Sequence, residues 1–356
     1  MTDAAGDGAM ATVALDIEQP EALAAYLRRG GWIGPSEPVA MSVLAGGVSN
    51  RTVLVRRPTG DAWVLKQALP KLRVAVDWFS DPARIHREAL GLRWLATAVP
   101  ERALAAFVFE DQDRHVLAMR AVPEPHENWK AMLLEGRVNR DHVTQFGCLL
   151  GTIHRVGTER RAEVARLFDD RSFFESLRIE PYYGYTASRV PEAARFLRAL
   201  IDETHATRLT VVHGDYSPKN ILIREETCVL LDHEVIHFGD PAFDVGFSLT
   251  HLLSKAHHLP ARRAAFVEAA AVYWRAYGEA LGGVAWAADL EERVVRHTLA
   301  CLLARVAGRS PLEYLAPLER GRQRAAVVSL LSRVPTRVPH LIAQFMHLIT
   351  QDEARV

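Results

Sequence analysis

The sequence predicts an α+β protein of two lobes: a small lobe with a five-stranded antiparallel sheet and one long helix, and a larger, mainly helical lobe. Three observations predict this class. Short runs rich in β-branched and aromatic residues recur between residues 39 and 119. Apolar residues at helical spacing dominate from residue 141 onward. A chain of 356 residues, 49% of them hydrophobic, is long enough for two packed lobes.

The small, nucleotide-binding lobe is expected over residues 20–122. Residues 1–19 are small and polar, and we expect them to be flexible. A short helix is expected to begin at Pro20 and to end at a pair of glycines. Strands are expected at 39–45, 52–57, 62–67, 107–109 and 115–119, with a Pro-Thr-Gly-Asp turn between the second and the third.

The long helix of the small lobe is expected to start at Asp81 and Pro82, a capping residue followed by a proline in the first turn. Glu88 lies beside the apolar stripe of this helix. Lys66 closes an apolar strand, where a lysine must reach water or an anion. Glu88 can therefore face Lys66, and a solvated Glu88 is the alternative.

The larger lobe, which is to carry the catalytic loop and substrate-binding helices, is expected over residues 123–356. The stretch 167–185 is aromatic and irregular, and we expect a packed surface loop there in preference to an insert that covers the substrate. Asp244 is expected to cap the helix that follows it. Helices are expected at 141–155, 191–205, 261–281, 287–307, 320–333 and 339–350.

Two short apolar runs in this lobe each end in a carboxylate, the first in Asp215 and the second in Asp232. We expect the first run to be a strand entering a tight loop, and the second to be a hairpin arm that brings Asp232 near Asp215. Asn220 follows Asp215 by five positions. Phosphoryl transfer from a nucleotide needs such a set, because one carboxylate accepts the hydroxyl proton while an amide oxygen and a second carboxylate hold Mg²⁺.

His213-Gly214-Asp215 with Asn220, Asp232 and the upstream Lys66 resembles the catalytic segment of the aminoglycoside phosphotransferase and choline kinase superfamily, small-molecule kinases with a protein-kinase-like fold. The resemblance implies a bilobal protein-kinase-like fold and ATP-dependent transfer of the γ-phosphate to a hydroxyl of a small polar metabolite. It makes Asp215 the catalytic base and substrate contact, and His213 a brace of the catalytic loop.

The same resemblance implies nucleotide and metal contacts. Lys66, paired with Glu88, would neutralise the non-transferred phosphates of ATP. The turn between the first two strands would bring backbone amides to the phosphates, with an ordinary hairpin turn as the alternative. The implied contacts are Gly46, Gly47, Ser49 and Asn50 in that turn, Met119 and Val122 at the adenine hinge, Asn220 and Asp232 on Mg²⁺, and Glu234 on a second metal or a metal-bound water.

Residues 62–92 are locally similar to methylthioribose kinase, which has a comparable lysine strand and Ala-Leu-Pro turn. That branch has a serine where this chain has Asn220. It also carries adjacent arginines that hold the substrate near its C-terminal helices, whereas this chain has Arg305 alone at the corresponding place. Arg305 is therefore the predicted substrate contact, with a surface residue as the alternative.

The composition bears on the partners. Lys+Arg and Asp+Glu both number 43, so no net charge favours nucleic acid or a membrane. A polycationic aminoglycoside would prefer an acidic cleft and is therefore a weaker fit than a small polar metabolite. An aminoglycoside O-phosphotransferase and an inactive nucleotide-binding module stay as alternatives. Three widely spaced cysteines and the lack of a signal-like or membrane-spanning run predict a cytoplasmic protein. The oligomeric state is open, and a homodimer is one option.

Overall fold

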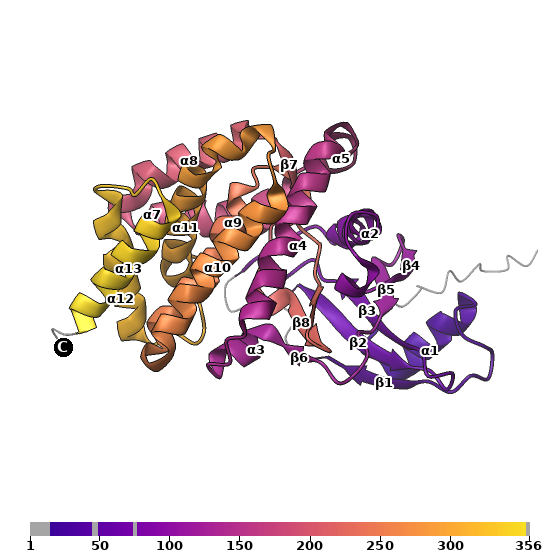
Figure 1. The fold of residues 1–356 in the computed structure, drawn as a ribbon. Coiled ribbons are helices and arrows are strands. Elements are labelled where there is room, and N and C mark those ends of the chain that lie inside the picture. The colour runs from indigo at the N-terminus through magenta and orange to yellow at the C-terminus, as the bar shows by residue number, and fades with distance from the viewer. Residues whose placement is uncertain (1–14, 45–48, 74–76, 354–356) are drawn as a thin grey trace, which may run out of the picture.

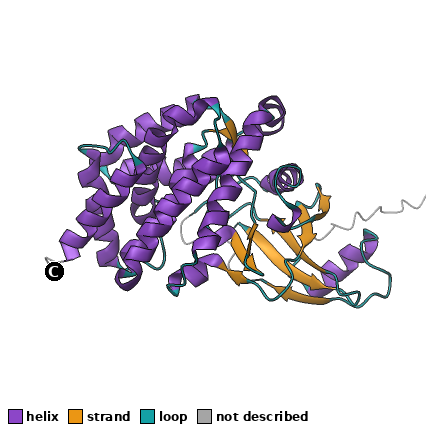
Figure 2. Ribbon diagram, in the orientation of Figure 1, coloured by secondary structure: helices purple, strands orange, loops and turns teal. Residues whose placement is uncertain are grey.

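The computed structural model describes residues 15–44, 49–73 and 77–353 of the chain. It has the predicted α+β architecture. A five-stranded antiparallel sheet forms one lobe, and helices make up most of the other (Figures 1 and 2). The predicted fold class is thus confirmed.

The sheet of the small lobe has the strand order β1-β2-β3-β5-β4. Its pleat sends alternate residues of β3 to opposite faces, so Trp63 and Leu65 pack beneath α1 (Pro20–Arg29), whereas Val64 and Lys66 face the other way. The strands are β1 (Ala40–Val43), β2 (Asn50–Arg56), β3 (Ala62–Ala68), β4 (Phe107–Asp111) and β5 (Val116–Arg120).

The N-terminal stretch predicted to be flexible lies mostly outside the described residues. Its described part, from Leu15, packs on the sheet. Ile17 is fully buried in the same cluster as Leu23 and Leu27 of α1, and its backbone N–H donates to Gln67 Oε1 at 3.3 Å. The apolar residues at its end therefore belong to the core of the small lobe.

Helix α2 (Arg84–Leu95) covers the second face of the sheet, where Ile85, Ala89 and Leu92 pack together with Met119. The helix begins at Arg84, slightly later than predicted. Asp81 caps the turn just before this helix and not the helix itself. Its Oδ1 accepts from the N–H of Ala83 at 2.9 Å. The buried stripe places Glu88 beneath Lys66, as the spacing predicted.

Close packing between long helices holds the large lobe together. A Cβ added to Gly151 in α4 would lie 2.5 Å from the carbonyl oxygen of Tyr277 in α10, so only glycine allows this approach. The helices are α3 (Trp129–Leu134), α4 (Arg140–Glu159), α5 (Arg161–Phe168), α6 (Ser172–Phe174), α7 (Tyr185–Arg189), α8 (Ala194–Ala206), α9 (Ala242–His258), α10 (Arg263–Leu281), α11 (Leu290–Ala307), α12 (Pro317–Leu331) and α13 (Val338–Glu353).

The stretch 167–185 is not the surface loop that the sequence predicted. Most of it is helical, with a π-helix at Glu175–Gly184 between α6 and α7. A π-helix has wider turns than an α-helix, so its buried residues do not recur at the spacing by which a helix is usually found. Leu177 and Ile179 are both about 1% exposed, which shows that the segment is part of the core.

Two small sheets carry the predicted catalytic segments. β7 (Thr210–Val212) pairs with β10 (His237–Gly239) and leads into the loop with Asp215. β6 (Glu127–Asn128) pairs with β8 (Ile221–Arg224), whose hairpin partner β9 (Thr227–Leu230) ends just before Asp232. The predicted strand and hairpin arm are therefore present. None of the helices in the described ranges is both long and apolar enough to cross a bilayer.

Candidate active site

Lys66, Glu88 and Asp232 meet where the two lobes join. Lys66 Nζ lies 2.6 Å from Glu88 Oε1 and 2.9 Å from Asp232 Oδ1. Strand β3 supplies the lysine, α2 the glutamate, and the segment after β9 the aspartate. One ion-pair network thus joins the sheet, the long helix and the large lobe.

Burial and charge act against each other in this network. Burial lowers the pKa of Lys66, but the charges of Asp232 and Glu88 outweigh it and hold that pKa above its usual value. Burial raises the pKa of Glu88 to about 7, and the nearby Lys66 opposes that rise. Although burial raises the pKa of Asp232, Lys66 lowers it well below the usual range. Lys66 is therefore a permanent cation at neutral pH.

The loop after β7 is fixed by Asp244, which lies in the first turn of α9. Its Oδ2 accepts from the N–H of His213 at 2.6 Å, and its Oδ1 accepts from the N–H of Gly214 at 2.8 Å. Asp244 was predicted to cap the helix, but that contact comes from Asp240, whose Oδ1 accepts from the N–H of Ala242 at 3.0 Å. The carboxylate of Asp244 instead faces the catalytic loop, because the loop amides need a buried acceptor.

Gly214 is required by the shape of this loop. Its φ of +77° lies in the left-handed region, and an added Cβ would meet the carbonyl oxygen of Val235 at 2.9 Å. The sharp turn directs the next residue, Asp215, inward, where it is 4% exposed.

Three side chains contact the carboxylate of Asp215, Asn220 through a hydrogen bond and Arg178 and Lys219 through ion pairs. Arg178 Nη2 lies 2.8 Å from Oδ1, while Asn220 Nδ2 and Lys219 Nζ lie 2.7 Å and 3.3 Å from Oδ2. Burial raises the pKa of Asp215, but the charge of Arg178 and then that of Lys219 outweigh it and hold the pKa below its usual value. Asp215 is therefore ionised at neutral pH.

Arg178 is a site residue that the sequence reasoning missed. It lies in the π-helix, its side chain is 8% exposed, and its Nε donates to the carbonyl oxygen of Gly214 at 2.8 Å. One guanidinium therefore holds both the backbone and the carboxylate of the catalytic loop. The available signal was a single arginine between Leu177 and Ile179, since a charged residue inside a buried apolar run needs an ionic partner.

His213 supports the loop in its neutral form. Its Nδ1 accepts from the N–H of Asp215 at 3.2 Å, and its Nε2 lies 3.1 Å from Nδ1 of His233. An accepting Nδ1 requires the proton to be on Nε2, which then donates to His233. Burial lowers the pKa of His213, so this form is the stable one.

Glu234 contacts Asn50 at the start of β2 and Arg84 at the start of α2. Its Oε2 accepts from Arg84 Nε at 3.1 Å and from Asn50 Nδ2 at 3.4 Å. Arg84, which the sequence reasoning did not single out, is fully buried and also donates to the carbonyl oxygen of Ser49. The carboxylate of Glu234 thus offsets a buried guanidinium, and its predicted metal contact stays a prediction. Gly46 and Gly47 lie outside the described residues.

Met119 and Val122 lie at the end of β5 and in the segment after it. Met119 is 5% exposed and is paired with Val64 in the sheet, whereas Val122 is half-buried. Arg305, in α11, is only 9% exposed, so it is not the surface residue of the alternative reading. Its Nη1 donates to the Tyr182 hydroxyl at 3.1 Å and to Ser310 Oγ at 2.9 Å.

Asn220 and Asp232 have the donor chemistry for Mg²⁺. The amide nitrogen of Asn220 donates to both the side chain and the backbone carbonyl of Asp215, which orients the amide oxygen away from that carboxylate. Asp232 adopts a φ of +68°, a strained conformation for a non-glycine residue of the kind that recurs at functional sites. The described residues contain no cluster of three His, Cys, Asp or Glu side chains arranged for a metal.

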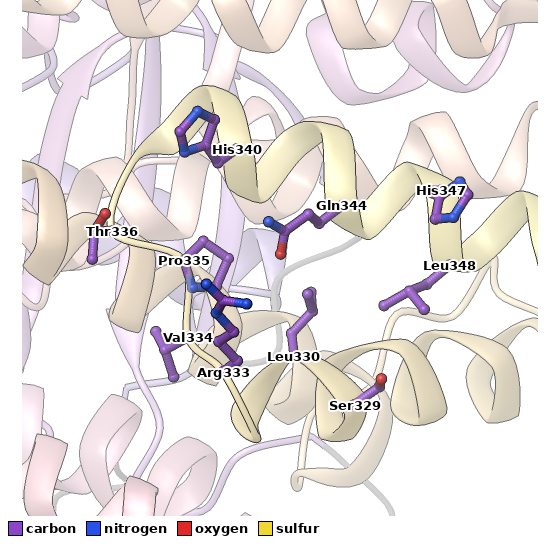
Figure 3. Close-up of a pocket in the computed structure, with 10 residues that line it drawn as sticks. All are labelled: Ser329, Leu330, Arg333, Val334, Pro335, Thr336, His340, Gln344, His347 and Leu348. Carbon is purple, nitrogen blue, oxygen red and sulfur yellow. The ribbon is translucent and has the colours of Figure 1, made fainter.

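A hollow of about 590 Å³ lies elsewhere, between α12 and α13 (Figure 3). Its lining includes His340, Gln344 and His347 from α13 but no carboxylate and none of the predicted site residues. Without an acidic oxygen donor it has no means to hold Mg²⁺. The predicted site residues Lys66, Glu88 and Asp232 lie instead in the ion-pair network at the junction of the lobes.

The fold and the Lys66–Glu88–Asp232 network together define a protein-kinase-like phosphotransferase class. The sequence profile of the phosphotransferase enzyme family matches residues 40–290, more than half of the chain. This chain belongs to that family, and the resemblance to the aminoglycoside phosphotransferase and choline kinase group is confirmed.

Individual relatives are more distant. Methylthioribose kinase 2 of Oryza sativa subsp. japonica is 24% identical over 265 residues, which is 67% of this chain and 60% of that protein. The chain thus spans less than two thirds of that relative. Amicoumacin kinase, solved with AMP-PNP, Ca²⁺ and Ami, superposes with a TM-score of 0.56 at 14% identity over 86% of this chain and 93% of its own. A putative fructosamine-3-kinase from Thermobifida fusca superposes with a TM-score of 0.50 at 19% identity. The superposition covers 91% of this chain and 98% of that protein.

Proposed function

We propose that this chain transfers the γ-phosphate of ATP to a hydroxyl group of a small polar metabolite. The observation that carries the proposal is the 2.9 Å contact between Lys66 Nζ and Asp232 Oδ1, which joins the lysine of the small lobe to the catalytic hairpin of the large lobe. A lysine for the phosphates and a carboxylate for their Mg²⁺ need to lie this close in a nucleotide-dependent phosphotransferase.

Lys66 retains donor capacity for a phosphate. An ammonium group has three N–H donors, and Glu88 and Asp232 each accept one. The remaining donor suits a non-transferred phosphate of ATP. Because Lys66 also donates to Glu88, its ammonium is shared between Glu88 and Asp232. Lys66 and Asp232 therefore both remain at the place where the nucleotide would bind.

Asp215 likewise retains room for one more donor. A carboxylate accepts about four hydrogen bonds; Asn220 donates one to Oδ2, while Arg178 and Lys219 form ion pairs with Oδ1 and Oδ2. The open site on Oδ1, beside Arg178, suits the acceptor hydroxyl. Asp215 would orient this hydroxyl and take its proton as the bond to phosphorus forms. A low pKa suits this role because proton transfer is late in a dissociative transition state.

Asn220 and Asp232 would bind Mg²⁺, which when present neutralises charge on the phosphates. Lys219 is half-exposed and forms an ion pair with Asp215. Its ammonium group would stay in contact with the phosphoryl group during transfer. Asp244 and His213 would hold the loop rigid during transfer. None of these side chains needs to move far from its described position.

The identity of the acceptor is best tested by a screen. Acceptor-dependent ADP formation would be followed with ATP and Mg²⁺ over methylthioribose, other sugars, amino alcohols and aminoglycosides. The proposal expects turnover with a sugar-like or other small polar metabolite. Turnover confined to aminoglycosides would favour the antibiotic O-phosphotransferase, and nucleotide binding without turnover would favour an inactive nucleotide-binding module. GTP in place of ATP would show the nucleotide preference.

A further inference from the structure

The side chains that continue from Asp215 into the large lobe are mainly basic. Arg178 contacts Asp215, and the guanidinium carbons of Arg178 and Arg305 each lie 5.6 Å from the ring centroid of Tyr182. Tyr182 thus links a cation at the catalytic carboxylate to a second cation in α11. Both arginine side chains are largely buried.

Lys255 of α9 adds a third buried cation. Its side chain is fully buried, and within the described residues its ammonium makes one hydrogen bond, a long one of 3.4 Å to the carbonyl oxygen of His251. The same ammonium lies 5.2 Å from the ring centroid of Tyr314. Lys255 therefore has an aromatic neighbour and a backbone oxygen, but no carboxylate contact among the described ion pairs.

The charges around Lys255 are unbalanced. Its pKa is lowered to about 7, mainly by burial, with smaller contributions from the charges of Lys130 and Arg305, while Glu313 opposes the shift. Glu313 is itself paired with Lys130 and is largely exposed. His251, one turn earlier, is 5% exposed, and its Nε2 is buried without a partner, as is Nε of Arg305. Nε2 of His251 and Nε of Arg305 therefore have no hydrogen-bond partner among the described residues.

Helix α9 connects this basic cluster to the catalytic loop. At its start Asp244 holds the loop, and Ser248 Oγ donates to the carbonyl oxygen of Tyr216 at 2.8 Å. Lys255 lies about 10 Å further along the helix, but its contact with His251 shows that the side chain leans back toward the loop.

We propose that the acceptor carries an anionic group, a carboxylate or a phosphate, which binds to Lys255, Arg305 and His251 while its hydroxyl lies against Asp215. This inference rests on the proposed function and narrows its substrate class to acidic metabolites. A buried ammonium with no carboxylate partner is costly to a folded protein, and an anionic ligand would offset that cost. Tyr314 and Glu313 lie in the segment between α11 and α12, which would have to shift to admit the ligand.

The test is a binding comparison with matched acids and neutral compounds. Calorimetry in the presence of AMP-PNP and Mg²⁺ would compare ribonate with ribose, gluconate with glucose, and ribose 5-phosphate with ribose. At least one acid should bind about tenfold more tightly than its neutral partner, and the pair that shows this distinguishes a carboxylate from a phosphate. Equal binding in every pair, including absence of binding for both members, would overturn the proposal.

Lys255→Met tests the site itself, because methionine keeps the volume and removes the charge. The variant should lose the acid preference, while the matched control Lys71→Met, at an exposed lysine of the small lobe, should keep it. A preference retained in a folded Lys255→Met protein would contradict the proposal. Acid-selective binding without acceptor-dependent ADP formation would refute the proposed function but leave the anion site standing.

Proton uptake on ligand binding is a further test, because a lysine that does not contact the ligand would take up no proton. At a pH one unit above 7, roughly nine tenths of Lys255 is uncharged, given its pKa of about 7. A bound anion raises this pKa, so binding should take up nearly one proton. Calorimetry in two buffers of different ionisation enthalpy measures this uptake. No uptake in the wild-type protein, or equal uptake in Lys255→Met, would argue against the assigned contact.

Discussion

Arg178 Nη2 lies 2.8 Å from Asp215 Oδ1, so the proposed base is paired with a buried cation that comes from a π-helix. The pair keeps Asp215 ionised and leaves part of Oδ1 open to a hydroxyl. Because the guanidinium also binds the carbonyl oxygen of Gly214, it fixes the carboxylate relative to its own loop. Arg178 acts on Asp215 in this account and is therefore a positioning residue.

Replacing Arg178 should change the pH dependence of turnover. The charge of Arg178 lowers the pKa of Asp215, and the base must be unprotonated to act. In Arg178→Met that pKa should rise, so the acid limb of kcat/KM moves to higher pH and kcat falls about 100-fold as the carboxylate loses its position. Arg178→Lys should recover part of both effects. An acid limb that stays in place in Arg178→Met would contradict the pairing.

Asp215→Asn should abolish most turnover while nucleotide binding persists. The amide cannot take the hydroxyl proton, and loss of general-base catalysis alone costs about 10²- to 10⁴-fold. Acceptor-dependent ADP formation and AMP-PNP calorimetry would measure the two properties. Asp202→Asn, at an exposed aspartate of α8, serves as the control and should behave as wild type. Full turnover in Asp215→Asn would remove the proposed base.

Lys66→Met should impair both stability and turnover. It removes the cation between Glu88 and Asp232, which leaves two carboxylates close together, one of them fully buried. Breaking a buried ion pair in this way costs about 3–5 kcal/mol, and loss of the phosphate contact should lower kcat about 10²- to 10³-fold. Denaturant unfolding and steady-state kinetics are the measurements. Lys71→Met is the matched control, and equal behaviour of the two variants would count against the network.

Lys255 should make stability rise with pH. Its pKa falls from 10.5 to about 7 in the folded protein, so between these values the unfolded chain binds one more proton than the folded chain. The free energy of unfolding should therefore gain about 1.4 kcal/mol per pH unit from this group, and Lys255→Met should lose that gain. Denaturant unfolding between pH 7 and 9 would compare the free energies of unfolding of the ligand-free wild-type protein and of Lys255→Met. Parallel pH profiles would show that the lysine is not buried as described.

Gly151 and Gly278 offer a matched pair for helix packing. A Cβ at Gly151 would lie 2.5 Å from the carbonyl oxygen of Tyr277, whereas a Cβ at Gly278 in α10 meets nothing within 4 Å. Gly151→Ala should cost about 1–3 kcal/mol because the helices must separate, while Gly278→Ala should gain about 0.4–1 kcal/mol. Thermal and denaturant unfolding would report both. A neutral Gly151→Ala would mean that α4 and α10 are less closely packed.

Much of the site could be predicted from the sequence because its residues follow strong local signals. Lys66 stands near the end of an apolar strand, Glu88 lies beside a helical stripe, and Asp232 follows a hairpin arm. The structure brings these three residues together. The π-helix that carries Arg178 could not be predicted, because its wider turns do not repeat at 3.6 residues. The contacts of Arg84 with Glu234 and of Asp244 with the loop amides of His213 and Gly214 could not be predicted for a different reason. Each contact joins segments that are far apart in the chain, which no local pattern reveals.

The central claim is that Lys66, Asp215, Asn220 and Asp232 form one phosphotransfer site. The most direct measurement is the ³¹P NMR spectrum of the wild-type protein with ATP, Mg²⁺ and each acceptor of the screen, beside the same samples with Asp215→Asn. A new phosphomonoester signal should grow in step with ADP in the wild-type sample, and almost none should form in the variant. ATP that stays intact with every acceptor, ADP accompanied only by inorganic phosphate, or an equal phosphomonoester signal in Asp215→Asn would contradict it.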